Sequence, residues 1–456
     1  MGGIIAQDGF DYQLWDGLVR LPAWLVDPAF EEIIFEGLED MEARFFAPQA
    51  PRGRLLERFQ AKAGSLSPSE VCEVLESFFS FEKAYPQASR VHTLVTPRMP
   101  PTLAWLARDP ARVRKARPFY EPFDDMAAAS DAELRRRLVQ TYGAPLGEFV
   151  ATSVDVSERN LPDQDAAVAQ FDTELARAFP TLDANRRRVG EAFAALAELV
   201  RRSIGVPLGA GTLVHTIERV LGESLPIPTV FPLHIRSDRN EAQVSALQIN
   251  AANFSGGPVG FPPTTEWTNL IAALDSTSRW LRGRGVSRVR IGGSYRLTTA
   301  IALGFSFRAA TGFELEVPTR SGPWVTDDRP GSDDAAPTWL VEEPATLHEG
   351  RLIVSIGVLR DPAADLMRVG IPSKSMLRLH VSDPLQSGRI AQIAVATAKR
   401  AIDSAKTRLR PEQIDLFFAG PAAFAVLLGH RWNAMGRTQW HEFVPSDGQY
   451  VATALL

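Results

Sequence analysis

The chain has 456 residues, enough for two or three domains, and its 45% hydrophobic content can build ordinary cores. Neither an apolar run of about 18 residues nor a secretory or myristoylation signal is present, so we expect no membrane association. The net charge of −5 argues against a protein that coats DNA constitutively, and the single cysteine, Cys72, favours a reducing cytoplasm.

The first hundred residues predict the order helix, three strands, helix, strand. Apolar residues at helical spacing over 9–21 predict the first helix. Ser67-Pro68-Ser69-Glu70 has the pattern of a capping box, so we expect the second helix to begin there. Short apolar runs predict the strands at 32–36, 41–46, 55–62 and 90–96.

The polar groups on these predicted strands suit metal-dependent phosphodiester cleavage. Asp40 and Glu42 stand at the start of one strand, and Gln60 and Lys62 end the next. Residues two apart in a strand share a face, so one hairpin can bring the four side chains to a common point. Carboxylate and amide oxygens can hold a divalent cation, and a lysine can stabilise charge on the attacked phosphate. The acids alone would more often be a solvated face.

The middle of the chain predicts a helical region that completes the first domain. Residues 164–179 and 186–204 have helical patterns, and either Asp183 or Asn185 can cap the second of these helices. Three basic clusters are candidate DNA-binding patches, although each can equally be a solvated helix face. They are Arg112, Arg114, Lys115 and Arg117; Arg135–Arg137; and Arg186–Arg188. The weak overall charge favours DNA binding by an assembly of several copies.

The C-terminal half contains an αβα pattern that occurs twice. A helix at 265–285, a strand at 287–291 and a further helix are followed, 125 residues later, by a helix at 390–408 and a strand at 413–418. The shift places Gly304 on Gly429 without a gap, which predicts a duplicated parallel α/β architecture. The chain has no dinucleotide-binding GxGxxG and no Walker loop, and its seven histidines form no metal-binding or nuclease cluster.

The N-terminal elements resemble the PD-(D/E)xK nuclease core, in the variant whose second acid is glutamine. The resemblance implies that Gln60 supplies an amide oxygen to Mg²⁺ or Mn²⁺ and that Lys62 is the catalytic cation. It implies Asp40 as the principal acid with Glu42 close behind, and the main metal ligand stays open between these two. Glu36 and Gln13 are implied as additional metal ligands.

Residues 226–456 resemble the SAVED domain, a fusion of two CARF-like, Rossmann-like units that senses cyclic oligonucleotides. The resemblance is firmest in GGSYRLTTAIALG and FFAGPAAFAVLLGHRWN. A pocket for such a ligand needs hydrogen-bond donors and stacking surfaces near strand ends and helix N-termini. The candidate ligand-binding residues are Arg236, Ser294, Tyr295, Arg296 and Lys374, with Trp339 and Trp267 as stacking surfaces. Trp267 can instead be a core residue, and Arg236 part of a surface ion pair.

A nuclease followed by a SAVED domain is similar to the effector nucleases of CBASS anti-phage systems. The resemblance implies a nuclease domain at 1–215 and a sensor at 216–456, with halves at about 226–330 and 338–456. It further implies that a cyclic di-, tri- or tetranucleotide, with the trinucleotide favoured, is made by a CD-NTase nucleotidyltransferase. The ligand would drive homo-oligomerisation and activate cleavage of double-stranded DNA. The alternatives are an inactive sensor or scaffold and a ligand-independent restriction-type nuclease.

Overall fold

The computed structural model describes residues 2–456 except 38–39, 117–124, 238–244, 256–259, 332–333, 335 and 446, and gives only the helical backbone at 2–8 and 114–116. The chain forms two compact units, Met1–Pro228 with Ala242–Ser245 and Thr229–Glu241 with Ala246–Leu456. Helix α8 (Ala210–Leu221) spans the predicted boundary at 215 and packs against α7 (Arg186–Arg202) in the first unit. Among the described residues, none of the helices combines the length and apolarity needed to cross a membrane.

The first unit is built on a six-stranded mixed sheet with strand order β5-β4-β3-β2-β1-β6. β1, β2 and β3 form an antiparallel meander, whereas β4 and β5 run parallel to β3. Together with α1 (Gly2–Leu25) and α2 (Pro68–Ala84), the elements confirm the predicted order. The strands are β1 (Phe30–Phe35), β2 (Met41–Phe46), β3 (Arg54–Ala61), β4 (Ser89–Thr96), β5 (Val154–Glu158) and β6 (Leu208–Gly209).

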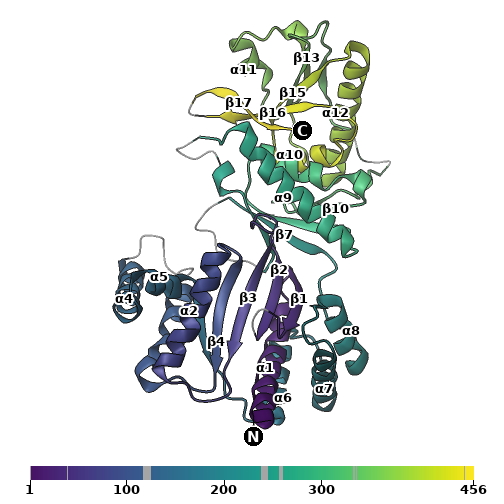
Figure 1. The fold of residues 1–456 in the computed structure, drawn as a ribbon. Helices are drawn as coiled ribbons and strands as arrows, with labels where there is room; N and C mark the ends of the chain where they lie inside the picture. Colours follow the sequence, from purple (N-terminus) through teal and green to yellow (C-terminus); the bar gives the residue numbers. More distant parts are fainter. Residues whose placement is uncertain are drawn as a thin grey trace. The chain divides into compact units, whose positions relative to one another are not determined.

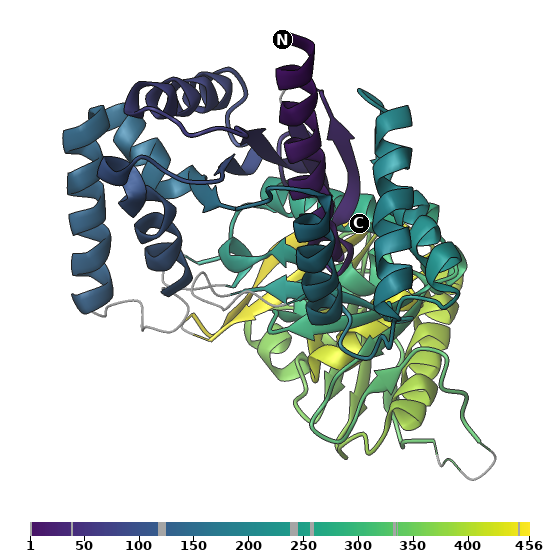
Figure 2. The ribbon, with the colours of Figure 1, turned by 90° about the horizontal axis from the view of Figure 1, so that it is seen from below.

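Helices α1 and α2 cover opposite faces of this sheet (Figures 1 and 2). Phe59 of β3 packs edge-on against Trp24 of α1 at 5.5 Å, while the guanidinium of the preceding Arg58 lies 3.4 Å from the ring centre of Phe81 on α2. Successive strand residues point to opposite faces, so β3 lies between the two helices. The predicted capping box begins α2, because Ser67 Oγ accepts the N–H of Glu70 and the Glu70 carboxylate accepts the N–H of Ser67.

Further helices complete the first unit. α6 (Gln164–Ala178) and α7 confirm the two predicted helices, and the side chain of Asn185 caps α7 by accepting the N–H of Arg187. α6 packs against both α1 and α7. The structure adds η1 (Pro101–Ala107), α3 (Asp109–Ala116), α4 (Asp125–Tyr142) and α5 (Ala144–Ser153). Apolar side chains of α2, α4 and α5 share a core with β4 and β5.

The second unit contains two largely parallel sheets, which confirms the predicted α/β class. The first has the order β11-β10-β9-β7-β8 and the second β12-β14-β13-β15-β16-β17. The first sheet comprises β7 (Phe231–Arg236), β8 (Leu247–Asn250), β9 (Arg288–Gly293), β10 (Glu314–Val317) and β11 (Trp324–Val325). The second comprises β12 (Leu340–Glu342), β13 (Arg351–Val358), β14 (Met376–Val381), β15 (Gln413–Ala419), β16 (Thr438–Val444) and β17 (Gln449–Leu455).

The helices of the second unit follow the predicted duplication. β9 and β15 begin 125 residues apart (413 − 288), as do α10 (Leu297–Ser306) and α13 (Ala422–His430) (422 − 297). The matching preceding helices are α9 (Thr264–Gly283) and α12 (Gly388–Leu409). The described residues of this unit also form η3 (Ala252–Phe254), η4 (Ala309–Thr311), α11 (Ala363–Arg368) and η5 (Ser373–Ser375).

The two equivalent glycines lie where α10 and α13 cross. A Cβ atom on Gly304 would lie 2.1 Å from the carbonyl oxygen of Val426, and one on Gly429 would lie 2.2 Å from that of Ile301. Each glycine therefore admits the backbone of the opposite helix. The duplicated sequence position has become a reciprocal contact that joins the two halves of the unit.

Candidate active site and ligand site

Asp40 links the first helix to the end of β3. Its Oδ2 accepts the backbone N–H of Ala61 at 2.8 Å, and the side chain of Gln13 on α1 donates a second hydrogen bond to the carboxylate. The pairing of Met41 with Phe59 places Asp40 beside Gln60, because β2 and β3 are antiparallel. The structure therefore brings together Asp40, Gln13 and the Gln-x-Lys segment.

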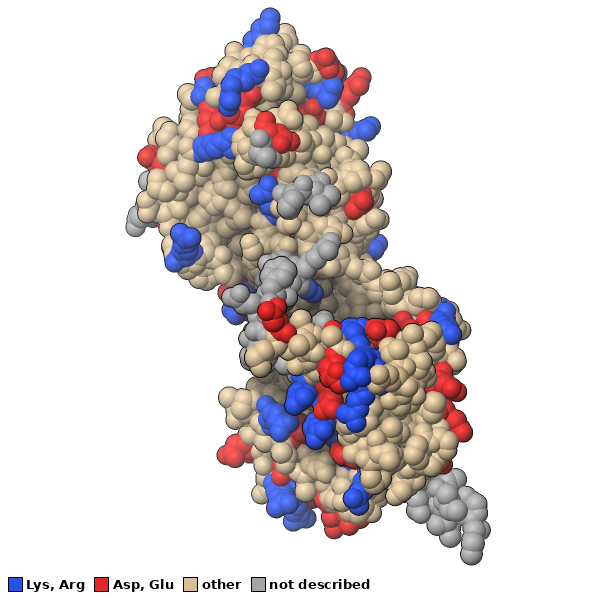
Figure 3. Space-filling view, turned by 90° about the vertical axis from the view of Figure 1, so that its left-hand side faces the viewer, with Lys and Arg blue, Asp and Glu red and all other residues tan. Residues whose placement is uncertain are grey.

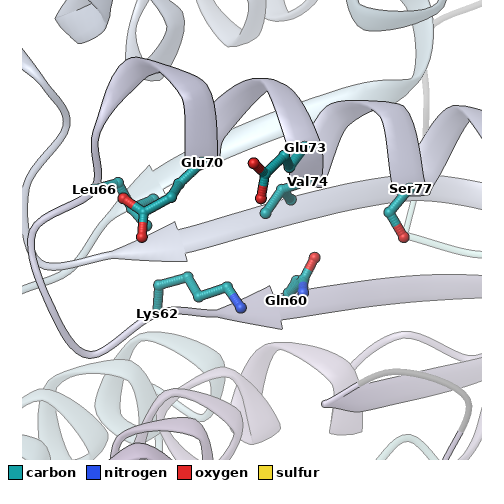
Figure 4. Close-up of a pocket in the computed structure, with 7 residues that line it drawn as sticks. All are labelled: Gln60, Lys62, Leu66, Glu70, Glu73, Val74 and Ser77. Atoms are coloured by element: carbon teal, nitrogen blue, oxygen red, sulfur yellow. The ribbon is translucent and has the colours of Figure 1, made fainter.

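Gln60 and Lys62 face a cavity beneath α2. The backbone N–H of Lys62 donates to Val95 at 2.9 Å, so the pairing of β3 with β4 extends one residue past the strand end. Figure 4 shows the amide oxygen of Gln60 pointing toward α2 and the side chain of Lys62 running along the strand toward Gln60. The cavity has a volume of about 230 Å³ and is lined by Gln60, Lys62, Leu66, Glu70, Glu73, Val74 and Ser77.

Burial disfavours the ionised forms of two carboxylates at this site, Asp40 and Glu36. Burial raises the pKa of Asp40, and hydrogen bonds from Ala61 and Gln13 and the charge of Lys62 oppose that rise. Burial also raises the pKa of Glu36, and the negative charge of Asp40 raises it further. A cation placed near both groups would remove the repulsion and compensate the desolvation.

The turn between β1 and β2 holds these two acids in a defined geometry. Glu36 adopts a left-handed φ of 52°, which is uncommon for a residue other than glycine, and its N–H donates to the carbonyl of Asp40 at 2.9 Å. Such conformations concentrate at functional sites. Residues 38–39, including the Glu39 of the acidic run, lie outside the described residues.

The donor set fits a magnesium or manganese ion. The amide oxygens of Gln13 and Gln60 are both buried and have no hydrogen-bond partner, so each has a free oxygen donor in a site that already contains carboxylates. Oxygen ligands are those that Mg²⁺ prefers. In the described part of the chain no three His, Cys, Asp or Glu side chains group around one point, so a metal held by Asp40 here depends on the amides.

Glu42 occupies a different environment from Asp40. Its side chain is 1% exposed, and its carboxylate lies 3.4 Å from the guanidinium of Arg44. It pairs across β2 and β3 with Arg58, another buried residue. Glu42 therefore lies within the sheet among arginines, whereas Asp40 lies at the strand ends beside the two glutamines.

In two of the three basic clusters, arginines form ion pairs with neighbouring acids. Arg135 pairs with Asp131 at 2.9 Å and Arg136 with Glu133 at 2.6 Å. Arg187 pairs with Glu191 at 3.1 Å. Basic and acidic side chains are accordingly interspersed on the face of the first unit shown in the lower part of Figure 3. Of the cluster at 112–117, only the Arg112 side chain is among the described residues, and it is exposed.

In the second unit, the carboxyl ends of strands from both sheets meet at Glu442. This side chain, at the end of β16, accepts the backbone N–H and the hydroxyl of Thr298 at the N-terminus of α10, each at 2.8 Å. Arg296 lies 3.6 Å from the same carboxylate. Burial raises the pKa of Glu442, opposed by the Thr298 hydrogen bonds and the charge of Arg296.

Several of the predicted ligand residues gather at this edge. Arg236 ends β7, and the hydroxyl of the adjacent Ser237 donates to the carbonyl of Ser294, which follows β9. Tyr295 is partly buried, and burial raises the pKa of its hydroxyl. Trp339 directly precedes β12, whose Leu340 pairs with His380 near the end of β14, so the indole also lies toward the strand ends.

Two predicted ligand residues lie elsewhere. The prediction for Trp267 is wrong, because its ring is fully buried and packs against Phe254 at 4.7 Å, which makes it a core residue of α9. Lys374 precedes β14, so it lies where the parallel strands begin, at the edge opposite to Arg296. Lys374 lies at this edge because α11 returns the chain across the sheet between β13 and β14. The sequence did not reveal this crossover.

A second cavity lies beside α11 and β15–β17. It has a volume of about 220 Å³ and is lined by Asp365, Leu366, Val369, Ile371, Phe417, His441, Gln449 and Tyr450. The imidazole of His441 stacks on Phe417 at 4.2 Å, and burial lowers the pKa of this histidine to about 4. The Tyr450 hydroxyl is buried without a hydrogen-bond partner, so the cavity carries a free polar group on an aromatic wall.

Sequence reasoning missed two acids of these sites. Glu73 lines the cavity of Gln60 and Lys62, and its position three residues after Glu70 on α2 was the available signal. Glu442 joins the two halves of the second unit, and no local pattern distinguishes it from an ordinary strand residue.

Comparison with known proteins agrees with this architecture. The model of the SAVED family, "SMODS-associated and fused to various effectors sensor domain", matches residues 272–456. The chain is 26% identical to CD-NTase-associated protein 4 of an Acinetobacter species and of Moraxella osloensis, in each case over 100% of this chain and 97% of the relative.

A solved structure resembles the chain over nearly its whole length. The Acinetobacter baumannii Cap4 SAVED/CARF-domain containing receptor, solved with the cyclic trinucleotide 2'3'3'-cAAA, superposes with a TM-score of 0.78 at 24% identity and covers 98% of each chain. The chain is thus similar throughout to CD-NTase-associated protein 4, and residues 272–456 match the SAVED family model, as the sequence resemblance predicted.

Proposed function

We propose that the chain is an anti-phage effector whose first unit cuts double-stranded DNA with a divalent metal when its SAVED unit binds a cyclic oligonucleotide. The nuclease part of this proposal is carried by one observation. Asp40 lies between Gln13 and the Gln60–Lys62 segment, and the two glutamines have buried amide oxygens without partners. Those oxygens would otherwise cost free energy, which favours a site built for a cation.

Each residue of this site would have a separate role in DNA cleavage. Asp40 and Gln60 would hold Mg²⁺ or Mn²⁺, with Gln13 and Glu36 as further ligands on the side of α1 and the β1–β2 turn. A bound divalent ion supplies an acidified water and neutralises charge on the phosphate. Lys62 points into the same cavity as Gln60, where its ammonium would stabilise the negative charge that develops on the attacked phosphate.

The sensor part is supported by the SAVED match and by the geometry at Glu442. Arg236, Ser294 and Arg296 lie at or just after the carboxyl ends of β7 and β9, the edge of an open α/β sheet where ligands bind, and the two arginines can pair with phosphate groups. The related receptor was solved with a cyclic trinucleotide, which favours that ring size. We propose that a CD-NTase supplies the ligand in the cytoplasm and that binding drives homo-oligomerisation. Basic and acidic side chains are interspersed on a single chain, so we propose that several assembled copies together provide the affinity for DNA.

The test is cleavage of plasmid DNA in Mg²⁺ across a panel of cyclic di-, tri- and tetranucleotides. We expect cutting with one ligand and at least about a 100-fold loss in Lys62→Ala, the scale for removing one group that stabilises transition-state charge. Lys83→Ala is the matched control, because Lys83 lies on the last turn of α2 and packs on Phe79 at 4.1 Å, away from the cavity.

The two alternatives give different results in the same assay. Cutting without any nucleotide would indicate a ligand-independent restriction-type nuclease. Binding of a nucleotide with no cutting in Mg²⁺ or Mn²⁺ would indicate an inactive sensor. Either result contradicts the ligand-gated nuclease.

A further inference from the structure

We propose that Glu73, on α2, is a further catalytic residue that binds the divalent cation in place of the acid missing at position 60. The inference rests on the proposed nuclease function. In the resemblance drawn above, the second acid of the motif is replaced by Gln60, a neutral ligand. The structure places a carboxylate from another element in the same cavity.

The geometry of the cavity carries the first step. Gln60 and Lys62 line one wall, and Glu70 and Glu73 line the opposite wall. Figure 4 shows both carboxylates on the side of α2 that faces the strand, with the amide of Gln60 pointing toward them. The Gln60 amide oxygen is buried and unpartnered, so a ligand entering this space would find an oxygen donor on each side.

Of the two acids, only Glu73 is available. Glu70 is committed to the capping box, accepting the N–H of Ser67 at 2.7 Å and its hydroxyl at 2.8 Å. Those hydrogen bonds, together with Lys62, lower the pKa of Glu70 and keep it ionised as part of the helix start. Glu73 makes no hydrogen bond or ion pair with any residue that the structure describes.

Helix α2 is a suitable support for a metal ligand. Val71, Val74, Leu75 and Phe78 are buried against the sheet, and the capping box fixes the first turn. A carboxylate on such a helix is held more precisely than one on a loop. The helix also supplies a negative charge across the cavity from Lys62, which would otherwise repel a cation approaching Gln60.

The experiment measures Mn²⁺ binding to the full chain directly, by isothermal titration and by the spin-resonance signal of free Mn²⁺. We expect Glu73→Gln to weaken binding by about 10- to 100-fold, and Asp40→Asn at least as much. Glu76→Gln is the matched control, because Glu76 is exposed on the same helix as Glu73 is, but contacts Cys72 and does not line the cavity. It should bind Mn²⁺ as the unaltered chain does.

A double variant distinguishes a metal ligand from a merely structural residue. If Glu73 supplies the missing carboxylate, Gln60→Glu should restore Mn²⁺ affinity to Glu73→Gln, because the acid returns to its place on β3. Unchanged Mn²⁺ binding in Glu73→Gln, while Asp40→Asn loses it, would overturn this inference and leave the nuclease intact. Unchanged binding in Asp40→Asn would instead overturn the proposed site itself.

Discussion

Burial and neighbours separate two acids that the sequence leaves equivalent. Asp40 and Glu42 lie two apart on one strand face, so spacing alone cannot choose between them. In the structure, Glu42 is 1% exposed beside Arg44, whereas Asp40 sits with two glutamines and Lys62 at the strand ends. A residue committed to a buried ion pair stabilises the fold, and a residue with uncommitted oxygen donors around it is free to bind a ligand.

Neutralising Asp40 should therefore impair DNA cleavage, whereas neutralising Glu42 should lower the stability of the fold. Asp40→Asn should reduce DNA cleavage by at least about 100-fold, the upper end for residues that support a metal site, and leave the unfolding midpoint nearly unchanged. Glu42→Gln should lower the free energy of unfolding by about 1–3 kcal/mol, because the buried carboxylate loses its charge-assisted contact with Arg44, which keeps Glu32 as its other partner. Urea unfolding and plasmid cleavage, measured on both variants, would distinguish the catalytic acid from the structural one. A stable but inactive Glu42→Gln protein would reverse the assignment.

At the scale of elements, local signals predicted much of the fold. Ser67 and Asn185 cap helices where the pattern placed them, and the strand at 41–46 has its predicted bounds. Among the elements that were missed, β13 is an almost fully buried apolar run, which looks alike as helix or strand, whereas α11 is only six residues long and too short to show a period. A crossover between strands is a property of the tertiary fold. For the same reason the sequence could not place Lys374 at one edge or Glu73 above Lys62.

The crossing of α10 and α13 gives a test of the duplicated unit. Gly304→Ala should lower the free energy of unfolding by about 1–3 kcal/mol, the usual cost of overpacking, because its Cβ would lie 2.1 Å from the Val426 carbonyl. Gly283→Ala, at the end of α9 in open space, should be neutral or stabilising by up to about 1 kcal/mol. The stabilities of the two variants can be compared by denaturant unfolding, with tryptophan fluorescence as the signal. Equal stability of the two variants would contradict the close crossing.

For the whole molecule, each unit contains a histidine that is buried in its neutral form. In the first unit, burial and then the charge of Arg58 lower the pKa of His92 to about 3. In the second unit, burial lowers the pKa of His430 to about 4, although its hydrogen bond to the Phe307 carbonyl at 2.6 Å acts in the opposite direction. Acid should therefore loosen both units.

The direction of this change in stability with pH follows from proton binding. An unfolded histidine has a pKa near ~6.5, so between about pH 6.5 and pH 4 the unfolded chain takes up a proton that folded His430 does not. Stability is thus complete above the unfolded pKa and falls as the pH drops, by up to about 3 kcal/mol from His430 alone. The raised pKa of Glu442 acts in the opposite direction, so the measurement must be a difference.

His430→Asn isolates the contribution of His430, because the asparagine amide can still donate to the Phe307 carbonyl but has no proton to gain. Urea unfolding of both proteins at pH 7 and pH 5 should show a smaller loss of stability in the variant. The part of the loss that remains should follow His92, in the other unit, and His441, whose pKa burial also lowers to about 4. Identical pH dependence in the two proteins would mean that His430 titrates normally and is not held neutral by the fold.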